Sequence, residues 1–560
     1  MRIRLVCALT VIFPLGTLIS IAVHEPKPKP NLLLIVADDM GFSDAACFGG
    51  EIRTPHLDAL AARGLRGTDF HTAPSCSPTR SMMLTGTDNH IVGIGNMAEW
   101  SGPEQKGKPG YEGHLNNRAL SVASLLRDSG YHTYMAGKWH LGEKPDEWPA
   151  AKGFERDFTL LQGAGSHWGD MLGLLPSEPK VSYTRNGEKL ESLPKDYYSS
   201  KDLTDTIIRN IDSNRGDGKP FFAYLAYQAP HGPIAVPDAW RDKYKGRYDK
   251  GYDAIRTERL ERQKKLGVVG KDAATFPRLP DIPAWDKLTD EQRKESARKM
   301  ELYAAMIEYM DDQIGRLLEH LKQTGQLDNT IIVFTSDNGA AGEDMAELMA
   351  KLAPTARGWF EKTFDNRIEN WGRPGSCVEY GPAWAQVSSV PFRQYKGVEA
   401  EGGIRTPLIV CGPGVSHQGT INHSLLHVMD LTSTFLESAG IIHPAKKEGA
   451  TMAAPQGKSM WPLLAGREPA TRGAADWVGW ELFGNRAIRQ GDWKLLRMLP
   501  AAGGTGDWEL FNLRNDPAET HDLSAEQPEK RNAFISLWDE YVKKNGVIVS
   551  DAGPFAKSKP

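Results

Sequence analysis

Two pairs of oxygen-bearing side chains stand just after apolar runs typical of buried strands. Asp38 and Asp39 follow "NLLLIV", and Asp337 and Asn338 follow "TIIVFTS". Carboxylate and amide oxygens, with no cysteine or histidine in either pair, favour Ca²⁺ or Mg²⁺. Carboxylates held close together repel and raise one another's pKa unless a cation binds them. Asp-Asp and Asp-Asn-Gly are also ordinary turn sequences, but two such pairs at matching strand ends predict a metal site.

Basic side chains follow two further strand-like runs. Lys138 and His140 come after "YHTYMAG", and His231 comes after "FFAYLAYQAP". Parallel strands bring their carboxyl ends to one rim of an α/β sheet, where such sheets bind their ligands. Lys138 and His140 are two residues apart and share a face if the chain stays extended there. Next to a metal, these side chains predict an anion cradle and proton transfer.

Cys76 stands in the stretch "TAPSCSPTRSMMLTGT", where Cys76, Pro78 and Arg80 form the pattern C-x-P-x-R. The flanking serines and threonine would make a poor core strand for a structural cysteine. A cysteine-phosphatase loop needs an arginine six residues after the cysteine, and that position is Met82. A thiolate nucleophile beside a dication would tend to bind softer metals. The pattern therefore indicates some other chemical role for Cys76.

The elements that must position these residues read as an α/β protein. Short apolar runs alternate with amphipathic helical segments, which predicts a large, mostly parallel sheet sandwiched by helices. The predicted strands cover 31–36, 131–137, 221–227, 330–336 and 407–413, and the predicted helices cover 56–64, 121–130 and 301–325. Residues 240–300 are highly charged and irregular, which predicts a solvated insertion. Beyond about residue 470, short antiparallel strands and a terminal helix predict a smaller C-terminal α+β subdomain.

The N-terminus is typical of a secreted protein. A basic "MRIR" precedes an apolar run and the small residues of "SIA", which predicts a cleaved signal peptide. An uncleaved membrane anchor is the alternative, although Pro14 and Gly16 interrupt the apolar run. We therefore expect an exported protein, periplasmic or extracellular. The predicted order is signal peptide 1–22, linker 23–30, catalytic domain 31–470, α+β subdomain 471–549 and tail 550–560.

The composition is that of an ordinary globular protein and excludes several classes. Of the 560 residues, 40% are hydrophobic and 25% are charged. A formal net charge of −4 offers no concentrated basic surface, so nucleic acid is not an expected partner. The five cysteines are irregularly spaced and form no zinc-binding cluster, which allows at most one disulfide.

Together these motifs resemble the type I sulfatases of the alkaline phosphatase superfamily. The resemblance rests on "ADDMG", "SPTRSMMLTG", "AGKWHLG", the "PH" at 230–231, "SDNG" and the "YKG" at 395–397. It extends from about residue 31 to the C-terminal "NLRNDPAETHDL". Longer stretches, such as "WGRPGSCVEYGPAWAQVSSVPFRQYKGVEAEGGIRTP", are similar to the Pseudomonas-type bacterial arylsulfatases.

The resemblance implies a chemical role for Cys76. In that family the motif cysteine is oxidised to formylglycine before folding, and Pro78 and Arg80 would belong to the signal read by the modifying enzyme. The hydrated aldehyde carries two hydroxyls, of which one would attack sulfur and the other would then expel sulfate. The implied Ca²⁺ ligands, with Mg²⁺ possible in its place, are the Cys76-derived side chain, Asp38, Asp39, Asp337 and Asn338.

The resemblance also implies a role for each basic residue. Arg80 would hold the hydrate and neutralise charge. Lys138 and Lys396 would grip the sulfate oxygens. His140 would be the base in the step that releases sulfate, and His231, with Lys396 near the leaving oxygen, would be the general acid.

The sequence therefore predicts a calcium-dependent sulfuric ester hydrolase, an arylsulfatase acting on small aryl or carbohydrate sulfate esters. A phosphonate or phosphate ester hydrolase with the same aldehyde is the nearest alternative. A non-catalytic protein that binds sulfated glycans is a further alternative, but it would not need an intact Cys76, Arg80 and His231. We expect the segments 240–300 and 340–395 to wall the substrate pocket.

Overall fold

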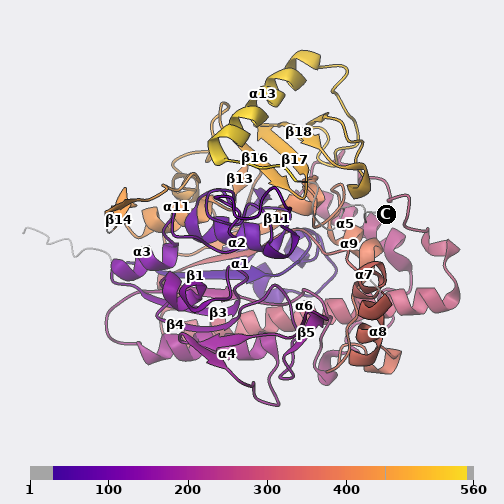
Figure 1. Ribbon diagram of the computed structural model, residues 1–560, viewed down its shortest axis with the longest axis horizontal. Helices are drawn as coiled ribbons and strands as arrows, with labels where there is room; N and C mark the ends of the chain where they lie inside the picture. The colour runs from indigo at the N-terminus through magenta and orange to yellow at the C-terminus, as the bar shows by residue number, and fades with distance from the viewer. Residues whose placement is uncertain (1–28, 353, 448, 551–560) are drawn as a thin grey trace, which may run out of the picture.

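A single eleven-stranded sheet runs through the molecule, and a second, smaller sheet lies beyond it toward the C-terminus (Figure 1). The computed structural model describes residues 29–352, 354–447 and 449–550. The predicted signal peptide 1–22, nearly all of the predicted linker and the tail after Ser550 lie outside the described residues. The predicted domain boundaries stay predictions.

The centre of the large sheet is parallel. Its parallel strands are β10 (Thr330–Ser336), β1 (Asn31–Ala37), β9 (Phe221–Ala226), β3 (His132–Lys138) and β4 (Arg156–Leu160), in that spatial order. The register pairs Val36 with Thr335 on one side and with Ala226 on the other, and Ala226 with Gly137. The four strands that carry predicted site residues therefore end at one rim, as the sequence predicts.

The edges of the large sheet are partly antiparallel. On one side β11 (Arg405–Cys411) runs antiparallel to β10, and β2 (Leu65–His71) runs antiparallel to β11. Short strands pair alongside β2, namely β12 (Thr420–Asn422) and β13 (Leu426–His427). On the other side β7 (Tyr183–Arg185) runs antiparallel to β4, and β8 (Glu188–Leu190) runs antiparallel to β7. The sheet is thus mixed but mostly parallel at its core.

Helices cover both faces of the large sheet. Leu33 and Ile35 point into a core shared with α1 (Pro55–Arg63), α4 (Ser199–Ser213) and α6 (Asp290–Gln323). Leu32 and Leu34 point into the opposite core, shared with α2 (Cys76–Thr85), α3 (Val122–Asp128) and α11 (Asp430–Ser438). Alternate side chains of one strand thus bury both faces, as expected for a sandwiched parallel strand. The predicted sandwich is confirmed.

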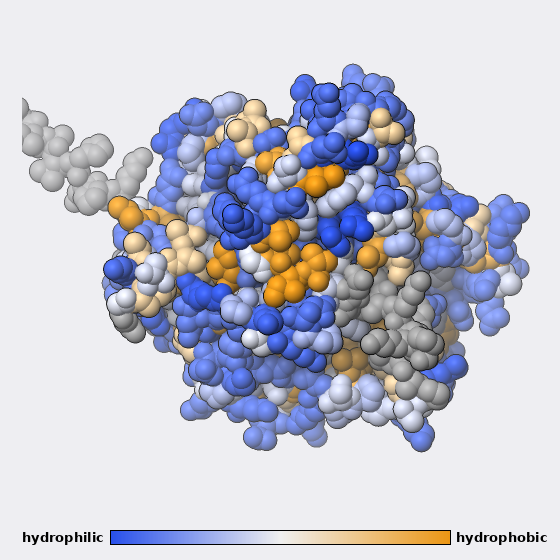
Figure 2. Space-filling view, turned by 45° about the horizontal axis from the view of Figure 1, so that its top comes forward, coloured by the Kyte–Doolittle hydropathy of each residue, from blue (hydrophilic) through white to orange (hydrophobic). Residues whose placement is uncertain are grey.

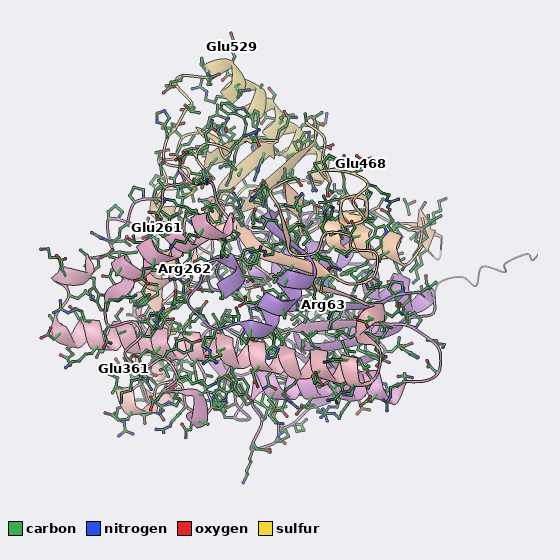
Figure 3. All side chains as sticks on the ribbon, turned by 180° about the vertical axis from the view of Figure 1, so that it is seen from behind. Arg63, Glu261, Arg262, Glu361, Glu468 and Glu529 are labelled. Atoms are coloured by element: carbon green, nitrogen blue, oxygen red, sulfur yellow. The ribbon has the colours of Figure 1, made fainter. Side chains whose placement is uncertain are left out.

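The segment 240–300 is largely exposed, as predicted, but the prediction that it is irregular is wrong. The segment contains α5 (Gly251–Leu266) and the first turns of α6, which begins with a capping box between Thr289 and Gln292. Arg259 on α5 is fully buried and pairs with Asp44 at 2.6 Å and Glu51 at 2.8 Å. Its neighbour Arg262, labelled in Figure 3, also pairs with Glu51. The charge of the segment was misleading at Arg259, which is neutralised inside the protein.

The C-terminal subdomain is a four-stranded antiparallel sheet with one helix, as predicted. Its strands are β16 (Trp477–Leu482), β17 (Asn485–Gln490), β18 (Trp493–Arg497) and β19 (Glu509–Asn512). Helix α13 (Pro528–Asn545) covers one face through Phe534, Trp538 and Tyr541. The other face packs against Val398 and Ile404 of the catalytic part, so the two parts share a core.

Several smaller elements lie outside the two main sheets. The hairpin β5 (Leu172–Leu175) and β6 (Glu178–Lys180) packs against α7 (Met345–Leu352) and α8 (Pro354–Thr363) through Leu174, Met349 and Phe360. The remaining elements are α9 (Gly381–Ser388), α10 (Glu401–Ile404), α12 (Trp461–Leu464) and the hairpin β14 (Lys446–Lys447) and β15 (Ala450–Thr451).

The surface is largely polar. Figure 2 shows a mostly hydrophilic face with apolar residues gathered near its centre. Among the described large apolar side chains only Leu266, Ile368 and Ile442 are exposed. In the part of the chain that the structure describes, no helix combines the length and apolarity needed to cross a membrane. The four described cysteines, Cys47, Cys76, Cys377 and Cys411, are all buried and free.

Candidate active site

The ends of β1 and β10 bring the predicted oxygen ligands together. The backbone turns at Asp39, whose φ is 67°, directly after Asp38. This turn lets two adjacent side chains face one centre, which a straight strand would forbid. The backbone N–H of Asp39 donates to Asp337 Oδ1 at 3.2 Å, which joins the two strand ends.

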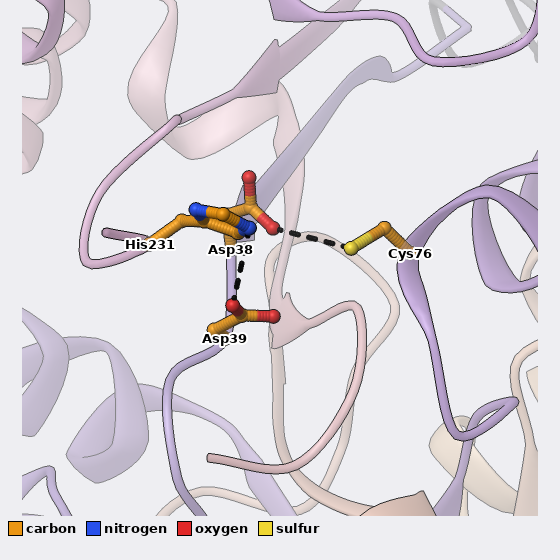
Figure 4. A group of neighbouring side chains, drawn as sticks. All are labelled: Asp38, Asp39, Cys76 and His231. Carbon is orange, nitrogen blue, oxygen red and sulfur yellow. Dashed lines mark hydrogen bonds and ion pairs between the residues drawn. The ribbon is translucent and has the colours of Figure 1, made fainter. Parts of the chain in front are cut away.

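Cys76 is the first residue of α2, and every residue of this helix is buried. Its Sγ lies 3.8 Å from Asp38 Oδ1, as Figure 4 shows. A helix N-terminus carries partial positive charge, which favours an anion beside Cys76. Burial raises the pKa of the Cys76 thiol to about 12, so at neutral pH the unmodified side chain is a protonated thiol and a poor nucleophile.

Arg80 lies one turn further along α2 and contacts residues at the ends of β10, β3 and β1. Its Nε and Nη2 donate to Asp337 Oδ2 at 3.0 and 2.7 Å, and its Nη1 donates to the Lys138 carbonyl at 2.9 Å. Its Nη2 also lies 3.6 Å from Asp38 Oδ1. Although burial opposes ionisation of Asp337, Arg80 and Lys138 outweigh it and lower the pKa of that carboxyl.

Two buried lysines face the two N-terminal aspartates. Lys138 Nζ donates to both oxygens of Asp38, at 2.9 and 2.8 Å, and Lys396 Nζ donates to Asp39 Oδ2 at 2.8 Å. Lys396 follows no strand of the large sheet. The backbone places it instead, because Lys396 N–H bonds to the Ala340 carbonyl and the next N–H, of Gly397, bonds to a carbonyl just before Cys76.

Asn338 completes the oxygen-rich group and has a free acceptor. Its Nδ2 donates to Asp39 Oδ1 at 2.6 Å, while its Oδ1 is buried without a hydrogen-bond partner. Burial raises the pKa of Asp38 to about 7, against the opposing effect of Lys138. An unsatisfied amide oxygen among three buried carboxylates suits a hard cation, and the donor chemistry fits Ca²⁺ or Mg²⁺.

His231 follows β9 and lies beside Asp39 (Figure 4). Its Nε2 is 3.4 Å from Asp39 Oδ2, and its Nδ1 donates to the Gly232 carbonyl at 2.7 Å. The neutral ring therefore offers Nε2 as an acceptor, and acting as a general acid requires the doubly protonated ring. Burial lowers the pKa of His231 to about 4, which works against that form in the unliganded protein.

The expectation that Lys138 and His140 share one face of an extended chain is wrong. The backbone turns at His140, whose φ is 56°, just after β3 ends. His140 therefore stands at the edge of the group, with its Nε2 3.0 Å from Glu99 Oε1. The remaining predicted site residues contact Asp38, Asp39 or Asp337 through their side chains.

Two acidic residues at the edge of the site escape sequence reasoning. Glu99 belongs to the short 3₁₀ helix Ala98–Trp100 and contacts His140. Glu343 precedes α7 and lies 3.5 Å from Lys396 Nζ. Neither follows a strand, so strand-end logic offers no signal for them, and only the folded chain reveals their position.

Comparison with known families matches this geometry. The sequence profile of the family described as "Sulfatase" matches residues 30–441. A second profile, "N-sulphoglucosamine sulphohydrolase, C-terminal", matches residues 396–545. The described C-terminal sheet lies within this second match.

Individual relatives agree with the family profiles. An uncharacterized sulfatase of Schizosaccharomyces pombe is 42% identical over 535 residues, which are 93% of this chain and 95% of the relative. An arylsulfatase of Klebsiella aerogenes is 43% identical over 417 residues, covering 74% of this chain and 88% of the relative. The fold resembles that of Ps i-CgsB in complex with k-i-k-neocarrahexaose, with a TM-score of 0.65, 23% identity and coverage of 93% and 94% of the two chains. The chain therefore belongs to the sulfatase family and is a sulfuric ester hydrolase.

Proposed function

We propose that this protein is an arylsulfatase that works with a formylglycine made from Cys76 and with a bound Ca²⁺. The observation that carries the proposal is the place of Cys76, which is buried at a helix N-terminus beside Asp38. Burial raises the pKa of its thiol to about 12, so an unmodified cysteine is a poor nucleophile here. Identity with a protein named arylsulfatase, at 43%, supports aryl sulfates as substrates.

The aldehyde would supply a hydroxyl nucleophile, and the cation would neutralise charge on that group and on the sulfate. The chain's own residues surround this position. Asp38, Asp39, Asp337 and Asn338 offer the oxygen ligands, and the unpartnered Asn338 Oδ1 is the vacant acceptor among them. Arg80 holds Asp337 in place and adds positive charge beside Asp38.

The remaining residues bind the sulfate and move protons. Lys138 and Lys396 are buried cations whose Nζ atoms meet Asp38 and Asp39, so both can turn toward sulfate oxygens. His231 lies beside Asp39 and would donate a proton to the leaving oxygen once its ring is doubly protonated. His140 would accept a proton in the step that releases sulfate.

Sulfated sugars are the second substrate class to test. One relative, 26% identical over 599 residues, is named an N-acetylglucosamine-6-O-sulfatase of Bacteroides thetaiotaomicron. A fold neighbour at 22% identity and a TM-score of 0.58 was solved in complex with its substrate, D-glucosamine-2-N,6-O-disulfate. A panel of aryl, alkyl and carbohydrate sulfates separates these classes.

The test combines mass spectrometry with kinetics. The tryptic peptide that contains Cys76 in active protein should show the mass loss of cysteine-to-aldehyde conversion, and the protein should hydrolyse 4-nitrophenyl sulfate. Full activity with only unmodified Cys76 would overturn the formylglycine proposal. Faster cleavage of phosphate or phosphonate esters than of sulfate esters would favour the phosphonate or phosphate ester hydrolase instead.

Export is a separate proposal, based on the N-terminal sequence alone. The basic start, apolar run and Ser-Ile-Ala predict a mature protein that begins near Val23. N-terminal analysis of the natural protein tests this, and Met1 retained on soluble cytoplasmic protein would contradict it.

A further inference from the structure

The two ring nitrogens of His140 are in unlike environments. Nε2 lies 3.0 Å from Glu99 Oε1, whereas Nδ1 is buried and has no hydrogen-bond partner. An ionised carboxylate can only accept a hydrogen bond, so Nε2 must be the donor of this pair. In the neutral ring the proton is then on Nε2, and Nδ1 carries the free lone pair. Glu99 thus selects the tautomer of a partly buried imidazole.

The backbone holds this imidazole in place. The N–H of His140 donates to the Leu161 carbonyl at 3.0 Å, and the preceding Trp139 is fully buried, with its indole N–H on the Glu147 carbonyl. Gly163 lies against the ring, because a Cβ at that position would overlap the His140 imidazole. The ring is therefore confined, and the contact to Glu99 decides which nitrogen carries the proton.

Other charged groups lie close enough to influence the pair. The positive charge of Lys138 lowers the pKa of Glu99. The negative charges of Glu143 and Glu99 raise the pKa of Glu178. The side chain of Glu99 is 43% exposed, and the neighbouring His140 lowers its pKa to about 2. Glu99 is therefore an anion throughout the neutral range and can stabilise a positive charge on the ring.

We propose that Glu99 is a positioning residue that fixes the His140 imidazole as the tautomer whose Nδ1 accepts a proton. This inference rests on the proposed function, in which His140 is the base. In that step the O–H bond of the remaining hydroxyl would break and its proton would bond to Nδ1, while the C–O bond to the sulfate ester oxygen breaks, the aldehyde re-forms and sulfate leaves. The proton on Nε2 stays on that nitrogen and donates to Glu99, and the imidazolium later passes the Nδ1 proton to water. Glu99 stabilises the imidazolium by charge and does not itself touch the substrate.

The chain provides a matched control at the other end of β3. There His132 Nδ1 lies 2.8 Å from Glu155 Oε2, a second carboxylate–imidazole pair at the opposite edge of the sheet. The Glu155→Gln variant removes that pair and leaves the active site untouched. It separates the loss of any histidine–carboxylate contact from the loss of this one.

The test uses full-length protein labelled with ¹⁵N-histidine, with His140 assigned by its absence in a His140→Asn variant. In the wild type we expect the neutral His140 ring to show a protonated Nε2 and a bare Nδ1. In Glu99→Gln we expect a mixture of tautomers, since no carboxylate then requires a proton on Nε2. Glu99→Asp should restore part of the wild-type behaviour, and Glu155→Gln should leave the tautomer of His140 unchanged.

The rate of sulfate ester hydrolysis provides a second test of the inference. With 4-nitrophenyl sulfate we expect Glu99→Gln to lower kcat by about 10²-fold, the lower end of what general acid–base catalysis contributes. An unchanged His140 tautomer in Glu99→Gln would overturn the inference whatever happens to the rate. Absence of sulfate ester hydrolysis by the wild type would contradict the proposed function instead, because the spectra report on Glu99 without turnover.

Discussion

Among the buried groups of carboxylates and cations in the described residues, two differ in how many of their polar atoms have hydrogen-bond partners. One is the active site. The other, which we term the junction cluster, lies where the catalytic part meets the C-terminal sheet and consists of Asp69, His71, Glu401, Arg405, Arg489 and Lys494. By residue type and spacing, Asp69, His71 and Glu401 could also hold a metal ion.

The junction cluster is paired internally. Arg489 donates to both oxygens of Asp69, at 2.9 and 2.6 Å. Glu401 receives Lys494 Nζ on Oε1 at 2.8 Å and meets His71 Nε2 at 3.0 Å on Oε2. Cations of the C-terminal strands therefore occupy the positions that a metal would need, and the cluster fastens the two parts together.

The active site, by contrast, keeps polar atoms without partners. Asn338 Oδ1 and His140 Nδ1 are buried and unpaired, and both Asp39 and His140 have a positive φ. Such strain and unsatisfied groups persist where the surrounding structure imposes them, and they concentrate at functional sites. The comparison teaches that the junction cluster is satisfied by its own side chains, whereas the active site leaves the acceptors Asn338 Oδ1 and His140 Nδ1 open to a ligand.

The substitution with the largest expected effect is Cys76→Ala, in the active site. We expect a loss of sulfatase activity on the order of 10⁴-fold or more, because the nucleophile is removed, with little change in thermal unfolding. Rates with 4-nitrophenyl sulfate and calorimetry check this. Cys47→Ala, which removes another buried free thiol, should keep its activity. Comparable activity in Cys76→Ala and Cys47→Ala would reject Cys76 as the reactive residue.

At the junction cluster we expect the opposite pattern. Lys494→Met leaves Glu401 and Glu519 as buried carboxylates without their lysine, which should lower the free energy of unfolding by about 3–5 kcal/mol. Denaturant unfolding followed by tryptophan fluorescence measures it. The control Lys458→Met breaks a surface pair with Asp476 and should cost at most about 1 kcal/mol. Equal losses in the two variants would contradict a structural role for the cluster.

His90 contacts Glu481 of the C-terminal subdomain, and the contribution of this contact to the free energy of unfolding should depend on pH. Burial disfavours charge on His90, but Asp88 and Glu481 outweigh it and raise the pKa of His90 to about 9. This contribution is complete below pH 6.5, the pKa in the unfolded chain, and is lost as pH rises through 9. We expect the free energy of unfolding to fall by up to about 3 kcal/mol over that window.

Unfolding of wild type and His90→Gln between pH 6 and 10 checks this expectation. The variant should lose this part of the dependence, since it has no group to titrate at position 90. Parallel curves for the two proteins would show that another group is responsible.

The smallest expected effect follows from removing the unpaired amide oxygen of Asn338. Asn338→Ala should weaken Ca²⁺ binding at least about tenfold, because one oxygen ligand is lost, while the free energy of unfolding changes by less than about 1 kcal/mol. Titration calorimetry with Ca²⁺ alone measures it. Asp69→Asn at the junction cluster should leave Ca²⁺ affinity unchanged, and weaker binding in that variant would mean that the junction cluster also binds the cation.

The sequence alone was enough to predict the large parallel sheet and most of the site. Long apolar runs such as 31–36 and 330–336 have few alternatives to a buried strand, and β1 and β10 confirm them. The polar pairs after those runs had to meet because parallel strands end at one rim. Local pattern also predicted the α+β character of the C-terminal subdomain, which β16–β19 and α13 confirm.

Tertiary structure decided what depends on partners distant in sequence. The charged segment 240–300 looked solvated, yet Arg259 is buried because Asp44 and Glu51, more than 200 residues away, neutralise it. Glu99 reaches His140 only because the chain folds back over the end of β3, and no local pattern reports such a contact. The physical reason is that strand and helix formation follow from neighbouring residues, whereas the pairing of buried charges depends on which distant side chains the fold brings together.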